Sequence, residues 1–171
     1  PVTVIWIVAV TNAVNLIDGL DGLSCGVSTI SALSILISSF FMPYVGFLPK
    51  LLTAILAGSC LGFLPYNFNP AKIFMGDTGS LTIGLIISAV ILRIIIDSEM
   101  EEEGIGNLIV KALSPVIVPC FDAVRVIFVR IKEKKKLFLP DNNHIHHRLL
   151  QAGLTQHAAL ITIVTVSLIL T

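Results

Sequence analysis

The chain has 171 residues, of which 55% are hydrophobic and only 13% are charged, and its mean hydropathy is +0.94. Eleven basic residues balance 11 acidic ones, so the formal net charge at pH 7 is zero. This composition excludes an ordinary soluble domain, and the even balance of charge argues against a nucleic-acid partner. We therefore expect an all-α, polytopic bundle of transmembrane helices in a lipid bilayer.

A helix that crosses the hydrocarbon core needs about 20 mostly apolar residues. The apolar runs predict four complete spans and two spans that the ends of the sequence truncate. The runs are residues 2–14 (truncated), 24–42, 45–64, 80–96, 105–128 and 158–171 (truncated). Pro115 and Pro119 should kink the fifth span without destroying it. We expect residues 1–171 to form a single integral-membrane domain, the C-terminal part of a longer chain.

The basic stretch RIKEKKK at residues 130–136 adjoins the fifth span, and basic loops of this kind favour the cytoplasmic side. Counting crossings back from this stretch places three loops on that side. They are residues 15–23, 65–79 and 129–157. The turn near Met42 and the acidic residues 97–104 fall on the opposite side. Nearly all unusual polar residues thus lie on one predicted face, which indicates a site there.

The first of these loops carries the stretch NAVNLIDGLDGLS, in which a polar residue recurs every three positions. The recurring residues are Asn12, Asn15, Asp18 and Asp21. On a helix end they would form one polar stripe. Two carboxylates held close together at a membrane boundary favour a bound cation, and a hard ion such as Mg²⁺ suits them. A solvated helix cap is the alternative interpretation.

The second loop ends in FMGDTGSLTIG at residues 74–84, where Asp77 stands at the start of a predicted helix. Helix N-termini favour anionic ligands, and glycines let a phosphate approach the backbone. A carboxylate in such a place is best explained if it holds a metal ion that bridges it to phosphate. The alternative is that Asp77 only caps the helix. A P-loop is excluded because the sequence lacks Gly-Lys-Ser/Thr.

The third loop contains PDNNHIHHRLLQAG, which places three imidazoles and a guanidinium within five residues. The residues are His144, His146, His147 and Arg148. This set suits phosphate charge or proton transfer near neutral pH. Zinc is the alternative, disfavoured because no His-Glu-x-x-His helix is present. Asp122 and Arg125, three residues apart near the end of the fifth span, either neutralise one another or join this site.

In this order, NAVNLIDGLDGLS, NPAKIFMGDTGSLTIG, PCFDAVRV and PDNNHIHHRLLQAG resemble the cytoplasmic motifs of the polyprenyl-phosphate N-acetylhexosamine-1-phosphate transferases. The Pro-Asp-x-x-His-x-His-His form is more similar to the bacterial undecaprenyl-phosphate GlcNAc-1-phosphate transferases than to the phospho-MurNAc-pentapeptide transferases. The resemblance implies transfer of a sugar 1-phosphate from a UDP-N-acetylhexosamine to undecaprenyl phosphate, with release of UMP. It also implies Mg²⁺ as cofactor, or Mn²⁺ in its place, and an active site on the cytoplasmic face of the inner (plasma) membrane.

The resemblance further implies roles for individual residues. Asp77 would ligate Mg²⁺, with Asn15 as a second ligand. The catalytic residues would be Asp18, Asp21, Asp77 and His146, and the substrate-binding residues Asn12, Asp122, His144, His147 and Arg148. The upstream paired-aspartate motif of the family is absent from the sequence, so these expectations concern a longer parent, acting alone or as a homodimer.

Two other classes remain open on the sequence. An ion-coupled transporter would also carry acids and histidines, but it would tend to place them near the bilayer midplane on broken helices. A purely structural membrane protein would not need the three polar loops to converge. Convergence of Asp18, Asp77 and His146 on one end of the bundle would therefore favour an enzyme over both.

Overall fold

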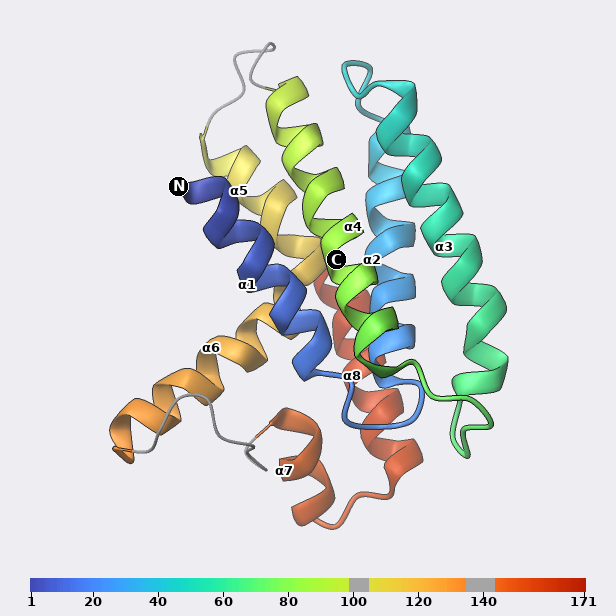
Figure 1. The fold of residues 1–171 in the computed structure, drawn as a ribbon, viewed down its shortest axis with the longest axis vertical. Coiled ribbons are helices and arrows are strands. Elements are labelled where there is room, and N and C mark those ends of the chain that lie inside the picture. The colour runs from blue at the N-terminus through green and yellow to red at the C-terminus, as the bar shows by residue number, and fades with distance from the viewer. Residues whose placement is uncertain (99–104, 135–143) are drawn as a thin grey trace.

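The structure, a computed structural model, describes residues 1–98, 105–134 and 144–171, and within these ranges every regular element is helical (Figure 1). The elements are α1 (Val2–Leu16), α2 (Leu23–Phe40), α3 (Phe47–Asn67), α4 (Gly76–Ser98), α5 (Ile105–Leu113), the 3-10 turn η2 (Ser114–Val116), α6 (Ile117–Lys132), α7 (Ile145–Gln151) and α8 (Gln156–Leu170). The predicted all-α fold is confirmed.

The long apolar runs form the long helices, as predicted. Four described segments are long and apolar enough to cross a membrane, namely Leu23–Phe40, Phe47–Asn67, Gly76–Ser98 and Ile109–Lys132. Two shorter apolar helices, α1 and α8, correspond to the truncated runs. Large apolar side chains such as Phe47 and Leu48 are exposed on the helix surfaces, which suits contact with lipid and not with water.

The fifth span is broken where the sequence places its first proline. Helix α5 ends at Leu113, and Pro115 lies in the 3-10 turn that leads into α6. Proline removes a backbone donor and clashes with the preceding turn, so the α-helical ladder stops there. The Ser31 hydroxyl donates a hydrogen bond to the Pro115 carbonyl. Figure 1 shows α6 turning away from the bundle after this break, while the helix continues through Pro119, so the kink lies at Pro115.

The core lies between two helix pairs, α1 with α4 and α2 with α3. Its buried side chains include Val10, Ile87 and Ile91 together with Cys25 and Cys60. All three cysteines are unpaired thiols, and Cys25 and Cys60 are buried in this cluster. These two cysteines are therefore core residues, whereas Cys120 is partly buried and packs against the cluster.

Helix α1 lies close against α4 at Gly84. A Cβ at this position would lie 2.8 Å from the Cα of Thr11 and 3.1 Å from its carbonyl oxygen. We expect Gly84→Ala to push the two helices apart and to cost about 1–3 kcal/mol of stability. The measurement is the thermal unfolding midpoint in detergent. Gly62→Ala is the matched control because nothing lies within 4 Å of its Cβ position, and equal midpoints for the two variants would contradict this packing argument.

The polar connections gather at one end of the bundle. The loop between α1 and α2, the loop between α3 and α4, and helix α7 all lie at the lower end in Figure 1. The turn between α2 and α3 lies at the opposite end, as does the C-terminal end of α4. The predicted sorting of the polar loops is confirmed for these connections, although residues 99–104 and 135–143 lie outside the described residues. Which end faces the cytoplasm stays a prediction.

Candidate active site

Helices α1 and α4 bring the first two polar loops into direct contact. Helix α4 begins at Gly76, where φ is +66°, so that Asp77 lies in its first turn and not before it. The Asn15 side-chain amide donates hydrogen bonds to Asp77 Oδ1 at 3.1 Å and to Ser80 Oγ at 2.9 Å. The two proposed metal ligands are therefore neighbours across the α1–α4 contact.

A polar cavity of about 300 Å³ opens beside this contact. Its lining includes the three carboxylates Asp18, Asp21 and Asp77, together with Gly19, Leu20, Asn67, Phe74, Met75 and Gly76. Burial, and secondarily the nearby charge of Asp77, raises the pKa of Asp18 to about 6. A bound cation is favourable in a cavity where one carboxylate opposes the ionisation of another, as Asp77 does for Asp18.

The donor set suits a hard, oxygen-seeking cation. Asp18 and Asp77 offer carboxylate oxygens, and the Asn15 amide would offer its oxygen if it were turned over. Mg²⁺ is usually held by one or two carboxylates and completes its shell with water or substrate phosphate. Within the described ranges no group of three or more His, Cys, Asp or Glu side chains is arranged to hold a metal, so any ion held by Asp18 or Asp77 would need further ligands from the Asn15 amide, water or substrate.

Asp21 connects three segments that are far apart in sequence. Its Oδ2 accepts hydrogen bonds from the Ala71 backbone N–H at 3.0 Å and from the Asn69 amide at 3.2 Å. The Asn69 amide also donates to Gln156 Oε1 at 2.6 Å, at the start of α8. Asp21 thus ties its own loop to the loop before α4 as well as lining the cavity, and its catalytic role stays a prediction.

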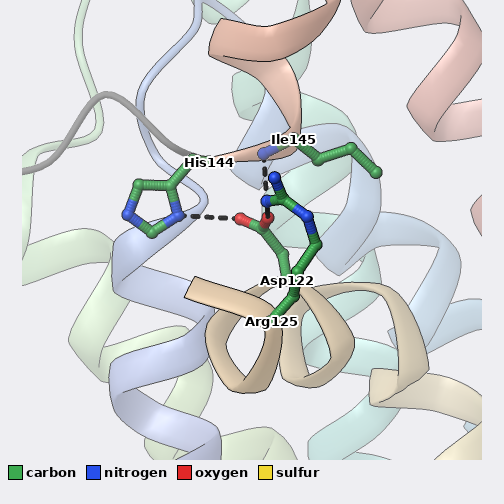
Figure 2. Close-up of polar contacts among 4 residues, drawn as sticks. All are labelled: Asp122, Arg125, His144 and Ile145. Atoms are coloured by element: carbon green, nitrogen blue, oxygen red, sulfur yellow. Dashed lines mark hydrogen bonds and ion pairs between the residues drawn. The ribbon is translucent and has the colours of Figure 1, made fainter. Parts of the chain in front are cut away.

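The third polar loop is anchored on α6 by Asp122, which is buried (Figure 2). Its Oδ2 lies 2.8 Å from His144 Nδ1, and its Oδ1 accepts a hydrogen bond of 2.8 Å from the Ile145 backbone N–H. Arg125 Nη1 lies 3.6 Å from the same Oδ1. The predicted pairing of Asp122 with Arg125 is therefore present, but the carboxylate is also joined to the start of α7.

The His146 ring packs against Gly19, in the loop that carries Asp18 and Asp21. His146 is only 1% exposed, and a Cβ added to Gly19 would lie 2.6 Å from its Cε1. Burial, followed by the neighbouring His147 and His144, lowers the pKa of His146 to about 4. The ring is neutral near pH 7, and neither of its nitrogens has a hydrogen-bond partner in the described part of the chain. In this form His146 can hydrogen-bond or accept a proton but supplies no positive charge.

The other sequence-predicted residues differ in how close they lie to this arrangement. His147 is half-buried with its ring centroid 4.3 Å from that of His146, and Arg148 is exposed. Asn12 is exposed on α1 and donates to the Val8 carbonyl at 2.7 Å, outside the cavity lining. The structure therefore does not bring Asn12 to the cavity, and its binding role stays a prediction without support.

Two uncharged residues of the site were missed in the sequence. Asn67 is buried in the cavity lining, and its amide donates to the Ile73 carbonyl at 3.0 Å while its Oδ1 has no hydrogen-bond partner among the described residues. Ser80 receives the Asn15 hydrogen bond. An asparagine or a serine beside an apolar run carries no distinctive spacing, so only the polar stretch around Asp77 could have drawn attention to them.

An apolar groove of about 510 Å³ lies between α3 and α4 and adjoins the polar cavity. Phe74 and Met75 line both spaces. The remaining lining is Leu52, Ile55, Leu56, Ser59, Cys60, Phe63, Thr78, Gly79, Thr82, Ile83 and Ile86. A molecule with a charged head and a hydrocarbon tail would find a polar and an apolar surface side by side here.

The fold and the site together define a polytopic membrane protein with carboxylates and histidines gathered at one end of its helical bundle. Comparison with known sequences gives the family. The profile of glycosyl transferase family 4 matches residues 1–95. The chain belongs to this family.

Relatives carry more particular descriptions. The chain is 42% identical over 99% of its length to a probable undecaprenyl-phosphate N-acetylglucosaminyl 1-phosphate transferase from Bacillus subtilis. It is 40% identical over 85% of its length to a decaprenyl-phosphate N-acetylglucosaminephosphotransferase from Mycobacterium leprae. A phospho-N-acetylmuramoyl-pentapeptide-transferase from Chlamydia muridarum is 54% identical over 54% of the chain. The chain spans 45%, 40% and 28% of these relatives, respectively.

Proposed function

We propose that this chain acts within a membrane enzyme that transfers GlcNAc 1-phosphate from UDP-GlcNAc to undecaprenyl phosphate and releases UMP, in the synthesis of a cell-envelope polysaccharide. The observation that carries the proposal is the cavity in which Asp18, Asp21 and Asp77 meet, at the polar end of an apolar bundle. Relatives described as transferases of this kind match 85–99% of the chain.

The reaction joins two phosphates and therefore requires neutralisation of several negative charges. An oxygen of the lipid phosphate would attack the β-phosphorus of the UDP-sugar, and the bond to the α-phosphate oxygen would break as UMP leaves. Bound Mg²⁺ would neutralise charge on the diphosphate, with Asp77 and Asn15 as its ligands. Asp18 and Asp21 would form the wall of the site, and His147 and Arg148 would contact phosphate oxygens. Neutral His146 would act as a hydrogen-bond partner or proton acceptor.

The acceptor is an amphiphile, and the surroundings of the cavity suit one. The apolar groove between α3 and α4 begins where the polar cavity ends, at Phe74 and Met75. A polyprenyl chain placed in this groove would keep its tail away from water while its phosphate lay near Asp77. This arrangement supports a lipid phosphate as the acceptor.

The alternative function is transfer of phospho-MurNAc-pentapeptide in peptidoglycan synthesis. The Chlamydia relative of that description is 54% identical, but over 96 residues only. The Bacillus relative described as a GlcNAc-1-phosphate transferase matches over 169 residues. Other pentapeptide transferases cover 95–99% of the chain, at 39% and 36% identity, against 42% for the Bacillus relative over 99%. The higher identity over nearly the whole chain favours the GlcNAc donor.

The deciding experiment is an assay of the whole protein in detergent with undecaprenyl phosphate and a panel of UDP-sugars. We expect UMP release with UDP-GlcNAc and little with UDP-MurNAc-pentapeptide. Release with the pentapeptide donor alone would establish the alternative. If no donor yields UMP and the reconstituted protein moves ions across vesicle membranes, the chain would instead be part of an ion-coupled transporter.

The pH dependence of Mg²⁺ binding provides a test that needs no turnover. Because the pKa of Asp18 is raised to about 6, this carboxylate loses its negative charge below that pH, and the attraction of the site for a cation at Asp77 weakens. We expect Mg²⁺ to raise the unfolding midpoint of the whole protein clearly at pH 7.5 and much less at pH 5. An equal shift at both pH values would mean that the charge of Asp18 does not contribute to Mg²⁺ binding.

The cytoplasmic position of the site can be tested by cysteine labelling. We expect a thiol introduced by Gly46→Cys to react with a membrane-impermeant reagent in intact cells, because residue 46 lies in the turn opposite the site. A thiol introduced by Thr155→Cys, at the start of α8, should react only after the membrane is opened. The reverse pattern would show that the site faces outward.

A further inference from the structure

The buried carboxylate of Asp122 is fully engaged by the segment that carries the histidines. The residue is 2% exposed and does not line the polar cavity. One oxygen lies 2.8 Å from His144 Nδ1 and the other accepts the Ile145 backbone N–H at 2.8 Å (Figure 2). Both contacts fall on the residues where α7 begins. Both distances are shorter than the 3.6 Å between Asp122 Oδ1 and Arg125 Nη1. Pairing with Arg125 therefore does not explain why the Asp122 carboxylate contacts the start of α7.

These contacts continue from α6 toward the acidic loop. The rings of His144 and His146 lie nearly parallel, with centroids 5.7 Å apart and planes inclined by 7°. The His146 ring in turn packs against Gly19, where even a methyl group would collide with it. Gly19 is flanked by Asp18 in the cavity lining. Asp122 is thus linked to the acidic loop through two imidazoles.

We propose that Asp122 is a positioning residue that fixes the start of α7 and thereby seats His146 against Gly19, beside Asp18. This inference rests on the proposed function, because it assigns Asp122 to the same site. It differs from the direct substrate contact that the family resemblance implies for Asp122. A buried carboxylate with both oxygens engaged holds its partners in one orientation, and loss of such support displaces groups that must be accurately placed for reaction.

The first test compares Asp122→Asn with wild type in the whole protein. Asn keeps the size of the side chain but loses the charge and one acceptor, so α7 should open more often. We expect amide hydrogen exchange in residues 145–152 to accelerate at least about tenfold. We expect kcat for UMP release to fall on the order of 100-fold, with a smaller change in KM.

Asp97→Asn is the matched control for this change. Asp97 is also a largely buried helical carboxylate paired with an arginine, since Arg93 Nη2 lies 2.8 Å from its Oδ1. It lies at the C-terminal end of α4, away from the polar cavity. We expect neither kcat nor exchange in residues 145–152 to change in Asp97→Asn. Equal effects of the two substitutions would reduce the role of Asp122 to general stability and overturn the proposal.

A double variant tests whether Asp122 acts through His144. Since Asp122→Asn and His144→Gln break the same contact, the double variant should be no worse than the more damaging single one. Additive losses of kcat would overturn the proposal.

The exchange measurement also separates the positioning role of Asp122 from the proposed function. Unchanged exchange in Asp122→Asn refutes the positioning role, whichever UDP-sugar the protein uses. Faster exchange in a protein that releases UMP from no donor would refute the proposed function alone, and faster exchange with normal kcat would refute positioning at the site.

A substitution at Gly19 tests the contact between His146 and the acidic loop. In Gly19→Ala the added methyl would collide with the His146 ring, and the backbone of Gly19 has no positive φ that would itself strain alanine. We expect this variant to lose kcat while its α7 amides stay protected. Gly106→Ala is the control because its Cβ would meet nothing within 4 Å. Normal kcat in Gly19→Ala would show that the position of the His146 ring against Gly19 does not affect turnover.

Discussion

Replacing Asp77 with Asn in the whole protein is expected to lower Mg²⁺-dependent UMP release by at least about 100-fold without unfolding the bundle. Asp77 is exposed at the cavity, and its carboxylate accepts a hydrogen bond from the Asn15 amide. An asparagine oxygen can accept the same hydrogen bond, so the α1–α4 contact survives. What the substitution removes is the negative charge that would hold the cation.

Two measurements separate this expectation from a role in helix capping. UMP release is followed at several Mg²⁺ concentrations, and the Mg²⁺-induced rise in the unfolding midpoint is recorded for wild type and variant. The variant should lose both the activity and the rise while its midpoint without Mg²⁺ stays near that of wild type. Near-normal rates at ordinary Mg²⁺ would show that Asp77 only caps α4.

The second large effect is expected in the histidine segment. His146→Gln and His147→Gln should each depress UMP release strongly, for different reasons. Replacing His146 disturbs the packing against Gly19, whereas replacing half-buried His147 would remove the proposed phosphate contact. Lys134→Gln and Lys135→Gln should have little effect, since a lysine beside a membrane end gains only about 1 kcal/mol from anionic lipid head groups. Lys134 is exposed just after α6, and Lys135 lies outside the described residues.

The comparison is made as UMP release from the four single variants at matched expression in membranes. Equal damage from the lysine and histidine substitutions would identify the segment as a lipid anchor. Retention of activity in His147→Gln alone would remove His147 from the phosphate-binding set while leaving the role of His146 intact.

The membrane helices could be predicted most fully from the sequence, because a run of about 20 apolar residues is typical of a helix that crosses a bilayer. Their ends were predicted less well. Helix α3 runs through Pro65 to Asn67, and α4 takes in the Gly-Asp-Thr-Gly turn that was expected to precede it. The short helix α7 was not predicted, since its seven residues depend on tertiary contacts for support. Pro115 indicated a kink, but the departure of α6 from the bundle depends on packing that no local pattern encodes.

For the site, the crossing pattern predicted that the loops of Asp18, Asp77 and His146 would meet, and they do. The pairing of Asp122 with Arg125 follows from their spacing on a helix. The contacts of Asp122 with His144, 22 residues away, and of His146 with Gly19 could not be predicted. They depend on how α6 and α7 are placed in space, and neither residue type has a spacing rule over such a distance.

The close approach at Gly84 has a consequence for evolution and engineering of the protein. Gly84 lies seven residues beyond Asp77 on α4, about 10 Å along the axis, and it faces Thr11, one turn before Asn15 on α1. The distance between the two helix axes at this glycine therefore also sets the distance between the two proposed ligands. A larger residue here would widen the gap between Asn15 and Asp77 even if other mutations restored stability. Stability and the proposed ion affinity would therefore change together at this contact between α1 and α4, so stabilising substitutions should be sought elsewhere.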